Sequence, residues 1–159
     1  MNAKERIMKH SSIGKTFTIA AVTAVALAIA PTAKAQDFGC SNVTVRGTFA
    51  QTGTGTITSP PSMAGPLANV GTLTFDGNGG VTGSLVNSVN GNTLPSTETG
   101  TYKVNPDCTG TYTVQLSLGF TANAFFAIAD GGNEIQIIVT DPGAVITCNA
   151  KRLYPGRAI

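Results

Sequence analysis

The segment Thr111-Tyr-Thr-Val-Gln-Leu-Ser-Leu118 is the clearest indication of the fold class of this 159-residue chain, because polar and apolar side chains alternate along it without a break. Successive side chains of a β-strand point to opposite faces, so the pattern predicts a strand with one buried and one solvated face. A second alternating segment, around Tyr102, lies on the other side of the turn Asn105-Pro-Asp-Cys108. Two such segments joined by a short turn predict an antiparallel hairpin.

Alternating segments of this kind recur in both directions along the chain, separated by turns rich in Gly, Asn, Asp and Pro. The clearest turns are Asp76–Gly80, Asn90–Asn92, Asp130–Gly132 and Asp141–Gly143. No helical period is sustained after Gln36. About eight short strands in consecutive hairpins predict an all-β domain. A single eight-stranded antiparallel up-and-down β-barrel is favoured over the alternative, a β-sandwich, because few connections are long enough for a Greek key.

The beginning of this domain has two features that affect where a site would lie. The first strand is predicted to include Val43, Val45 and Phe49, which alternate with polar residues. The stretch Thr52–Gly65 then breaks the pattern with a Gly-Thr-Gly-Thr run and a Ser-Pro-Pro-Ser run. It predicts a long loop or a frayed hairpin that closes over one end of the barrel as a lid.

Residues 1–35 have the organisation of a cleavable secretory signal peptide. Basic residues come first, and an apolar run from Phe17 to Ala30 follows. This run is shorter than the ~20 residues that span a bilayer, which disfavours the alternative of a transmembrane anchor. Small residues at Ala33 and Ala35 predict cleavage after Ala35. The mature protein is then the barrel domain of residues 36–159, and its expected location is secreted or periplasmic, in a bacterium.

Removal of the signal peptide reverses the sign of the net charge. The full chain has 10 basic and 8 acidic residues, which gives +2, whereas residues 36–159 hold 5 basic and 7 acidic residues, which gives −2. The basic character therefore belongs to the signal peptide. No electrostatic footprint for nucleic acid remains, and the mature protein is expected to have no membrane span.

Most catalytic and metal-binding motifs are missing from residues 36–159. The one histidine, His10, lies in the signal peptide, which removes His-dependent nucleophile pairs and most zinc sites. The turn Asp76–Gly80 weakly resembles a calcium loop, but Asn87 stands where an EF-hand has its bidentate Glu, so a hairpin turn is favoured. The sequence thus predicts no metal and no cofactor, and it disfavours an enzyme.

The three cysteines predict one disulfide, because an exported protein matures in an oxidising compartment. Cys40 precedes the first strand and Cys108 lies in the turn after the fourth, so an up-and-down barrel brings both to one end. Cys148 falls in the middle of the last strand. We therefore expect a Cys40–Cys108 disulfide and a buried Cys148 thiol; the alternative is three reduced, buried thiols.

Four polar residues form the candidate ligand-binding site, because each shares a strand face with apolar residues. The pairs are Gln51 with Phe49, Asn69 with Leu73, Asn87 with Leu85, and Glu98 with Tyr102. They are predicted at strand ends, at the barrel end opposite the disulfide, facing an apolar wall of Leu118, Phe120, Val139 and Ile146. Glu98 is the one carboxylate placed inside, where burial raises its pKa toward values useful for proton transfer. The alternative is that the strands fray and these residues meet water.

Three segments carry a resemblance to known proteins: Gly71–Gly83, Thr99–Thr111 and Phe126–Gln136, the last followed by Thr140–Gly143. Together they resemble a group of small exported bacterial β-barrel proteins of unassigned function. More distantly, the plan is similar to the allene oxide cyclase and dirigent type of barrel. The resemblance implies an eight-stranded barrel with a cavity open at one end, and it assigns no catalytic residue to this chain.

Three functions follow from these observations. The first is a small exported β-barrel protein that binds or interacts without catalytic chemistry, its partner being an apolar small molecule. The second, implied by the distant resemblance, is a cofactor-independent isomerase or cyclase that acts on an apolar small molecule in the barrel cavity. The third is a structural surface or matrix component whose barrel is filled. The volume of the barrel interior separates the third from the other two.

Overall fold

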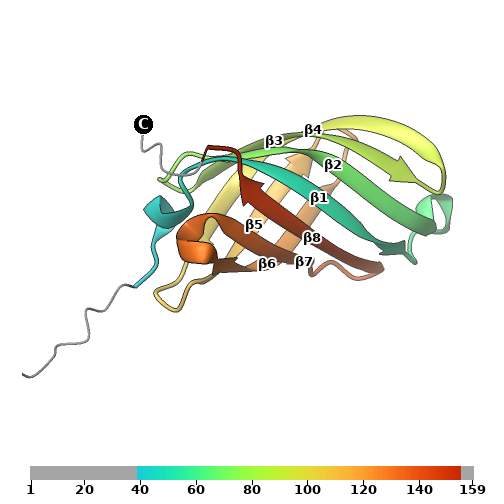
Figure 1. Ribbon diagram of the computed structural model, residues 1–159. Helices are drawn as coiled ribbons and strands as arrows, with labels where there is room; N and C mark the ends of the chain where they lie inside the picture. The colour runs from blue at the N-terminus through green and yellow to red at the C-terminus, as the bar shows by residue number, and fades with distance from the viewer. Residues whose placement is uncertain (1–38, 155–159) are drawn as a thin grey trace, which may run out of the picture. The chain divides into compact units, whose positions relative to one another are not determined.

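The computed structural model describes residues 39–154. They form one closed barrel of eight antiparallel strands, each paired with its neighbours in sequence and the last with the first (Figure 1). The strands are β1 (Gly47–Ile57), β2 (Gly65–Phe75), β3 (Gly80–Val89), β4 (Asn92–Val104), β5 (Thr109–Leu116), β6 (Thr121–Ala129), β7 (Glu134–Val139) and β8 (Ala144–Arg152). The predicted all-β up-and-down barrel is confirmed, and the sandwich alternative is wrong.

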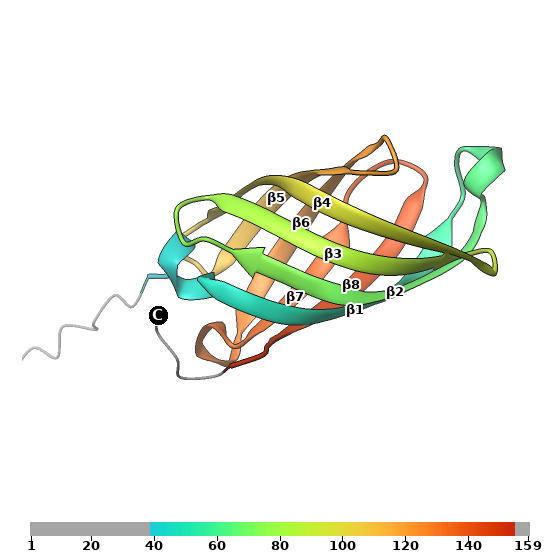
Figure 2. The ribbon, with the colours of Figure 1, turned by 90° about the horizontal axis from the view of Figure 1, so that it is seen from above.

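Short 3-10 turns mark the two ends of the barrel (Figures 1 and 2). The capped end, as we call it, holds η1 (Asn42–Val45), η3 (Asp130–Gly132) and the turn before Cys108. The open end holds η2 (Pro61–Met63) in the β1–β2 connection and the β3–β4, β5–β6 and β7–β8 turns. Since all connections join adjacent strands, odd strands run from the capped end to the open end and even strands return.

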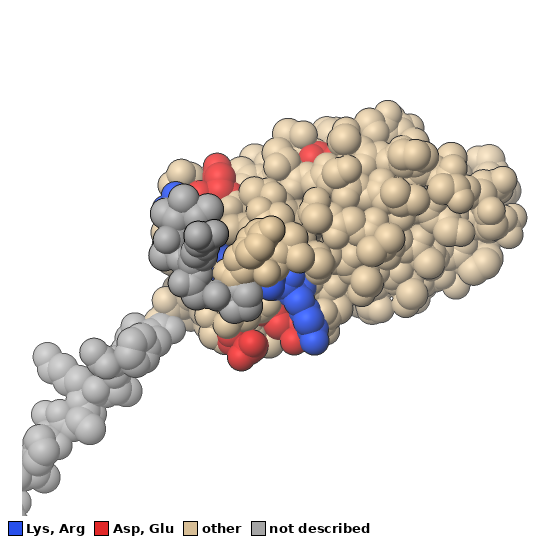
Figure 3. Space-filling model, turned by 45° about the horizontal axis from the view of Figure 1, so that its top comes forward, with Lys and Arg blue, Asp and Glu red and all other residues tan. Residues whose placement is uncertain are grey.

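Successive side chains of each strand point alternately into and out of the barrel, with apolar residues inside and mostly threonine and serine outside. On β5, for example, Tyr112 and Val114 are buried whereas Thr111 and Thr113 are exposed. The charged residues of the described part lie mainly near the capped end, and the face drawn in Figure 3 is uncharged toward the open end. The alternation predicted from the sequence is thus the rule that separates core from surface.

Aromatic side chains fill the interior of the capped end. Phe75 packs edge-to-face against Phe49 and Tyr102, with ring centroids 5.6 and 4.9 Å apart, respectively. Val45 of η1 is fully buried against them. Such edge-to-face pairs add to the hydrophobic free energy of burying the rings. This half of the barrel is therefore a packed core.

Arg152, near the end of β8, closes the capped end. Its guanidinium lies 4.6 Å from the centroid of the Phe49 ring and donates to the carbonyl oxygens of Thr44 (3.1 Å), Gly132 (2.7 Å) and Arg46. One planar cation thus ties η1 and η3 to the end of the barrel, which a lysine, with a single nitrogen, would not do in the same way.

The disulfide joins Cys40 to Cys108 at the capped end, with Cα atoms 4.9 Å apart. Cys148, in the middle of β8, is a buried free thiol. The predicted pairing is confirmed, and the alternative of three reduced thiols is wrong. A disulfide indicates an oxidising compartment, because cytosolic thiols are kept reduced.

The structure corrects two predicted boundaries at the start of the domain. Val43 belongs to η1 and is exposed, so the first strand begins only at Gly47. The stretch Thr52–Gly65 is not one long loop, because β1 continues to Ile57 and only residues 58–64 connect it to β2. The physical reason lies at Gly55, where a Cβ atom would collide with the backbone of Val145 and Ile146. The glycines here are inward positions of a continuous strand where β8 approaches closely.

Candidate functional site

The interior of the open half holds a cavity of about 330 Å³. Its walls are mainly apolar and include Ile57, Leu85, Val114, Leu116, Val139 and Ile146. The predicted apolar wall, which also includes Leu118 and Phe120, lines this same cavity. The aromatic rings of Phe49, Phe75 and Tyr102 lie outside its lining and form the core beneath it.

All four polar residues predicted to form a site line this cavity: Gln51, Asn69, Asn87 and Glu98. Gln51, Asn87 and Glu98 are buried, with relative exposures of 3, 5 and 5 %, respectively. The expectation that the strands fray and leave these residues in water is therefore wrong. The predicted positions at strand ends need correction for Gln51, Asn69 and Glu98, which lie inside β1, β2 and β4, whereas Asn87 is two residues from the end of β3. The Glu98 carboxyl accordingly lies deeper in the barrel than its predicted place at the rim.

Cross-strand register brings part of this group together. Asn69 lies directly opposite Asn87, and Gly53 lies between Asn69 and Cys148 in the row that crosses β8, β1 and β2. Glu98 faces Gly83 on β3, where a Cβ atom would lie 2.6 Å from Glu98 Oε1. The absence of a side chain at Gly83 thus gives the Glu98 carboxyl its place inside the wall.

The hydrogen bonds of the group are incomplete. The Asn87 amide nitrogen donates to the Leu94 carbonyl oxygen (3.1 Å) and to Ser96 Oγ (2.9 Å). By contrast, Gln51 Oε1, Asn69 Oδ1 and Glu98 Oε1 are buried acceptors without a hydrogen-bond partner in residues 39–154. Each buried acceptor left unpaired costs about 1–3 kcal/mol of folding free energy, so an interior with three of them is a feature that stability alone disfavours.

Glu98 is the one acidic residue buried inside the barrel, among the described residues. Burial raises the pKa of its carboxyl from 4.5 to about 7. Burial, with a further contribution from the Glu98 charge, raises the pKa of the Cys148 thiol to about 11 and also raises the pKa of the Tyr112 hydroxyl. Near neutral pH, Glu98 is thus the group of this cavity that gains or loses a proton.

Replacing Glu98 by Gln should stabilise the protein at high pH and leave its stability unchanged at low pH. The folded state holds the Glu98 proton more tightly than the unfolded state, so the carboxyl lowers stability as pH rises from 4.5 to about 7. Glu98→Gln should therefore raise the free energy of unfolding by about 2–4 kcal/mol at about pH 8, and by little at about pH 4. Denaturant titrations of both proteins at the two pH values measure this. A difference that does not change with pH would contradict it.

Sequence reasoning missed several residues of this cavity. Tyr112 and Cys148 line its inner part, and Ser96 supports Asn87. The strand period carries the signal for all three, because each shares a face with buried apolar neighbours. Tyr112 and Cys148 could not be recognised as site residues from this signal, because Tyr and Cys also serve as ordinary core residues.

The connection between β1 and β2 borders the mouth of the cavity, as the predicted lid would. Ser59, Pro60 and Met63 belong to its lining. The backbone of Thr58 donates to the Gly143 carbonyl oxygen at 2.7 Å, which links this connection to the β7–β8 turn. The covering segment is thus residues 58–64, shorter than the predicted Thr52–Gly65.

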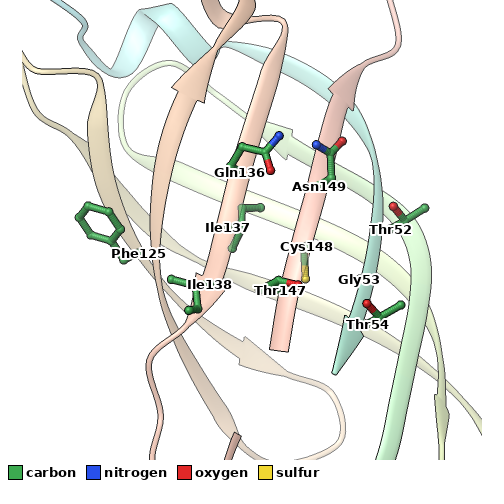
Figure 4. Close-up of a pocket in the computed structure, with 10 residues that line it drawn as sticks. All are labelled: Thr52, Gly53, Thr54, Phe125, Gln136, Ile137, Ile138, Thr147, Cys148 and Asn149. Carbon is green, nitrogen blue, oxygen red and sulfur yellow. The ribbon is translucent and has the colours of Figure 1, made fainter. Parts of the chain in front are cut away.

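A second hollow, of about 390 Å³, lies on the outer face of the barrel (Figure 4). Thr52 and Thr54 of β1, Gln136 of β7 and Asn149 of β8 line it. The amide nitrogens of Gln136 and Asn149 both donate to Glu134, so these side chains are already engaged with one another. No carboxylate belongs to its lining, in contrast to the cavity inside the barrel.

Two further features of residues 39–154 bear on the possible chemistry. The turn after Asp76 is a hairpin turn, in which Asp76 Oδ1 accepts from the backbone nitrogens of residues 78, 79 and 80. Within this part of the chain, no group of three or more His, Cys, Asp or Glu residues is placed to hold a metal ion. No helix in it is long and apolar enough to cross a membrane.

Comparison with known proteins supports the architecture. No protein-family model matches the chain, and no curated protein matches it in sequence. Among solved structures, it is similar to a de novo designed fluorescence-activating β-barrel, with a TM-score of 0.50 and 11 % sequence identity, over 69 % of this chain and 94 % of the designed one. At this identity the similarity concerns the fold alone: the chain is an eight-stranded antiparallel β-barrel of the same general form.

Proposed function

We propose that this protein binds a small, largely apolar molecule inside its barrel. The observation that carries the proposal is the cavity of about 330 Å³, apolar in most of its lining, into which buried acceptors of Gln51, Asn69 and Glu98 are built without partners. Small-molecule sites are typically cavities of roughly 300–1,000 Å³ with apolar walls and a few polar groups. A bound molecule would shield the apolar walls from water and pair with those acceptors.

A second candidate function is a cofactor-independent isomerase or cyclase, and Glu98 is the observation that favours it. Its carboxyl lies in an apolar cavity with a pKa of about 7, which suits a group that removes a proton and returns it at another atom. No histidine occurs in residues 36–159, so Glu98 would carry this proton transfer alone. Binding without chemistry stays the first candidate, because no second acid or base faces Glu98 with a pKa near neutral.

The third alternative, a structural component with a filled barrel, receives no support from a cavity of this volume.

We further propose that the protein is exported by a signal peptide cleaved after Ala35 and acts in the periplasm or outside the cell. Residues 1–38 lie outside the described part of the chain. The disulfide between Cys40 and Cys108 supports the proposal, because disulfides form in oxidising compartments.

Titration with a neutral apolar fluorophore, N-phenyl-1-naphthylamine, tests the proposed function. We expect saturable, one-to-one binding with a blue shift and an increase in emission, because the fluorophore leaves water for an apolar interior. A second small apolar molecule without fluorescence should displace it competitively. A linear, non-saturating signal at concentrations where the fluorophore is monomeric would contradict the proposal.

A further inference from the structure

The inner part of the cavity holds unpaired hydrogen-bond acceptors and no basic side chain. Its three unpaired buried atoms are all oxygens: Gln51 Oε1, Asn69 Oδ1 and Glu98 Oε1. No Lys, Arg or His belongs to the lining of this cavity. The Asn87 amide nitrogen, which could have donated, already bonds to Leu94 and Ser96. The inner part of the cavity thus carries one carboxyl, that of Glu98, and no basic side chain to offset its charge.

We propose that the ligand is an amphiphilic amine, whose protonated amino group binds beside Glu98 while its apolar body fills the rest of the cavity. This inference rests on the proposed function and names its ligand class. A primary ammonium has three N–H donors and no acceptor, so it can donate to the Glu98 carboxylate and still has N–H groups for amide oxygens of the lining. Its positive charge offsets that of the Glu98 carboxylate, and charge-assisted hydrogen bonds are about twice as strong as neutral ones.

Other ligand classes match less well. A carboxylate or phosphate would bring a negative charge next to Glu98 without a cation in the lining to offset it. An alcohol is neutral and would leave the charge of the Glu98 carboxylate without an opposite charge in the cavity. A hydrocarbon would leave all three unpaired and would add to the desolvation of Glu98.

The arrangement also sets the orientation of the ligand. Gln51 and Glu98 lie in the middle of β1 and β4, whereas Leu67, Val89 and Phe120 line the cavity near the ends of strands at the mouth. The amino group should therefore enter first and the apolar body should lie toward the open end. Ser59 and Pro60 of the β1–β2 connection would then border the apolar body.

Amine binding should depend on pH through Glu98. Tyr112 on β5 and Cys148 on β8 face the carboxyl, and burial raises the pKa of both, so they stay neutral across the relevant range. Asp141, at the mouth, accepts two hydrogen bonds from Asn123. The amine keeps its proton up to about pH 10. Affinity should therefore rise as Glu98 ionises and should level off above its pKa.

Competition experiments with octylamine and 1-octanol test the inference. The displacement of N-phenyl-1-naphthylamine by each compound is measured at about pH 5.5 and about pH 8.5, on either side of the Glu98 pKa. The native protein should bind octylamine about tenfold or more tightly at the higher pH, and more tightly than 1-octanol there. Glu98→Gln should lose this gain and its pH dependence while still binding the fluorophore. Glu134→Gln, which removes a carboxylate outside the cavity, is the control and should behave as the native protein does.

The outcomes separate this inference from the proposed function. If 1-octanol binds as well as octylamine at the higher pH, or if Glu98→Gln leaves octylamine affinity unchanged, the amine inference is wrong and the cavity remains a binding site. If the fluorophore, octylamine and 1-octanol all fail to bind, the proposed function is wrong as well. The pH series on the native protein needs no variant, so it decides the matter even if Glu98→Gln folds poorly.

Discussion

Ala122→Phe should weaken binding of the neutral fluorophore by at least about 30-fold, the largest functional effect expected of a single substitution. Ala122 lies on β6 and its side chain lines the cavity. A phenyl ring at this position would occupy a large part of a cavity of about 330 Å³. Fluorescence titration of the purified variant measures the loss of affinity.

Ala127→Phe is the matched control, because Ala127 is on the same strand but is exposed on the outer face. It adds the same ring to the surface and should leave the affinity within about twofold of the native value. Thermal unfolding should show that both variants are folded. A ring that fills a cavity and a ring added to the surface both change the free energy of unfolding little. Equal affinities for the two variants would mean that the fluorophore binds somewhere other than the barrel interior.

Removal of the disulfide should have the largest effect on stability. In the chain-entropy model, a link between residues 68 positions apart stabilises the folded state by about 4 kcal/mol, mainly by restricting the unfolded chain. The double variant Cys40→Ser, Cys108→Ser should therefore lose about 4 kcal/mol of unfolding free energy and melt about 10–20 °C lower. Denaturant and thermal unfolding, each at one pH, measure these changes.

Cys148→Ala is the control for the disulfide variant. It removes one buried thiol without touching the link, and it should cost about 1 kcal/mol. The native protein treated with a reductant should approach the stability of the double variant. Equal stabilities of the double variant and the oxidised native protein would mean that the link between Cys40 and Cys108 contributes nothing to the fold.

The barrel could be predicted from the sequence because every second side chain of a strand faces the core, which leaves an alternating apolar pattern. Tyr112 and Val114 alternate with threonines in the sequence, and in the structure the first two are buried while the threonines beside them are exposed. The disulfide could be predicted for the same reason, since counting strands places Cys40 and Cys108 at one end. Both inferences depend only on topology and parity, which the sequence carries locally.

Other features could not be predicted, because they depend on how closely the strands approach one another. Gly55 looks like a loop residue until the backbone of β8 is seen to exclude a Cβ atom there. The parity of Glu98 follows from the sequence, but its depth depends on where β4 begins. Arg152 contacts Thr44 and Gly132, which are far from it in the sequence. No local sequence pattern predicts these contacts.

Methyl NMR of the complex with the neutral fluorophore shows whether the ligand binds inside the barrel or on its surface. Val114 and Ile146 line the cavity, whereas Val70 and Val86 point outward, with relative exposures of 56 and 48 %, respectively. We expect intermolecular NOEs from the fluorophore to the methyl groups of Val114 and Ile146 and none to those of Val70 and Val86. NOEs to the outward pair alone, with the inner methyl groups unperturbed, would contradict binding inside the barrel.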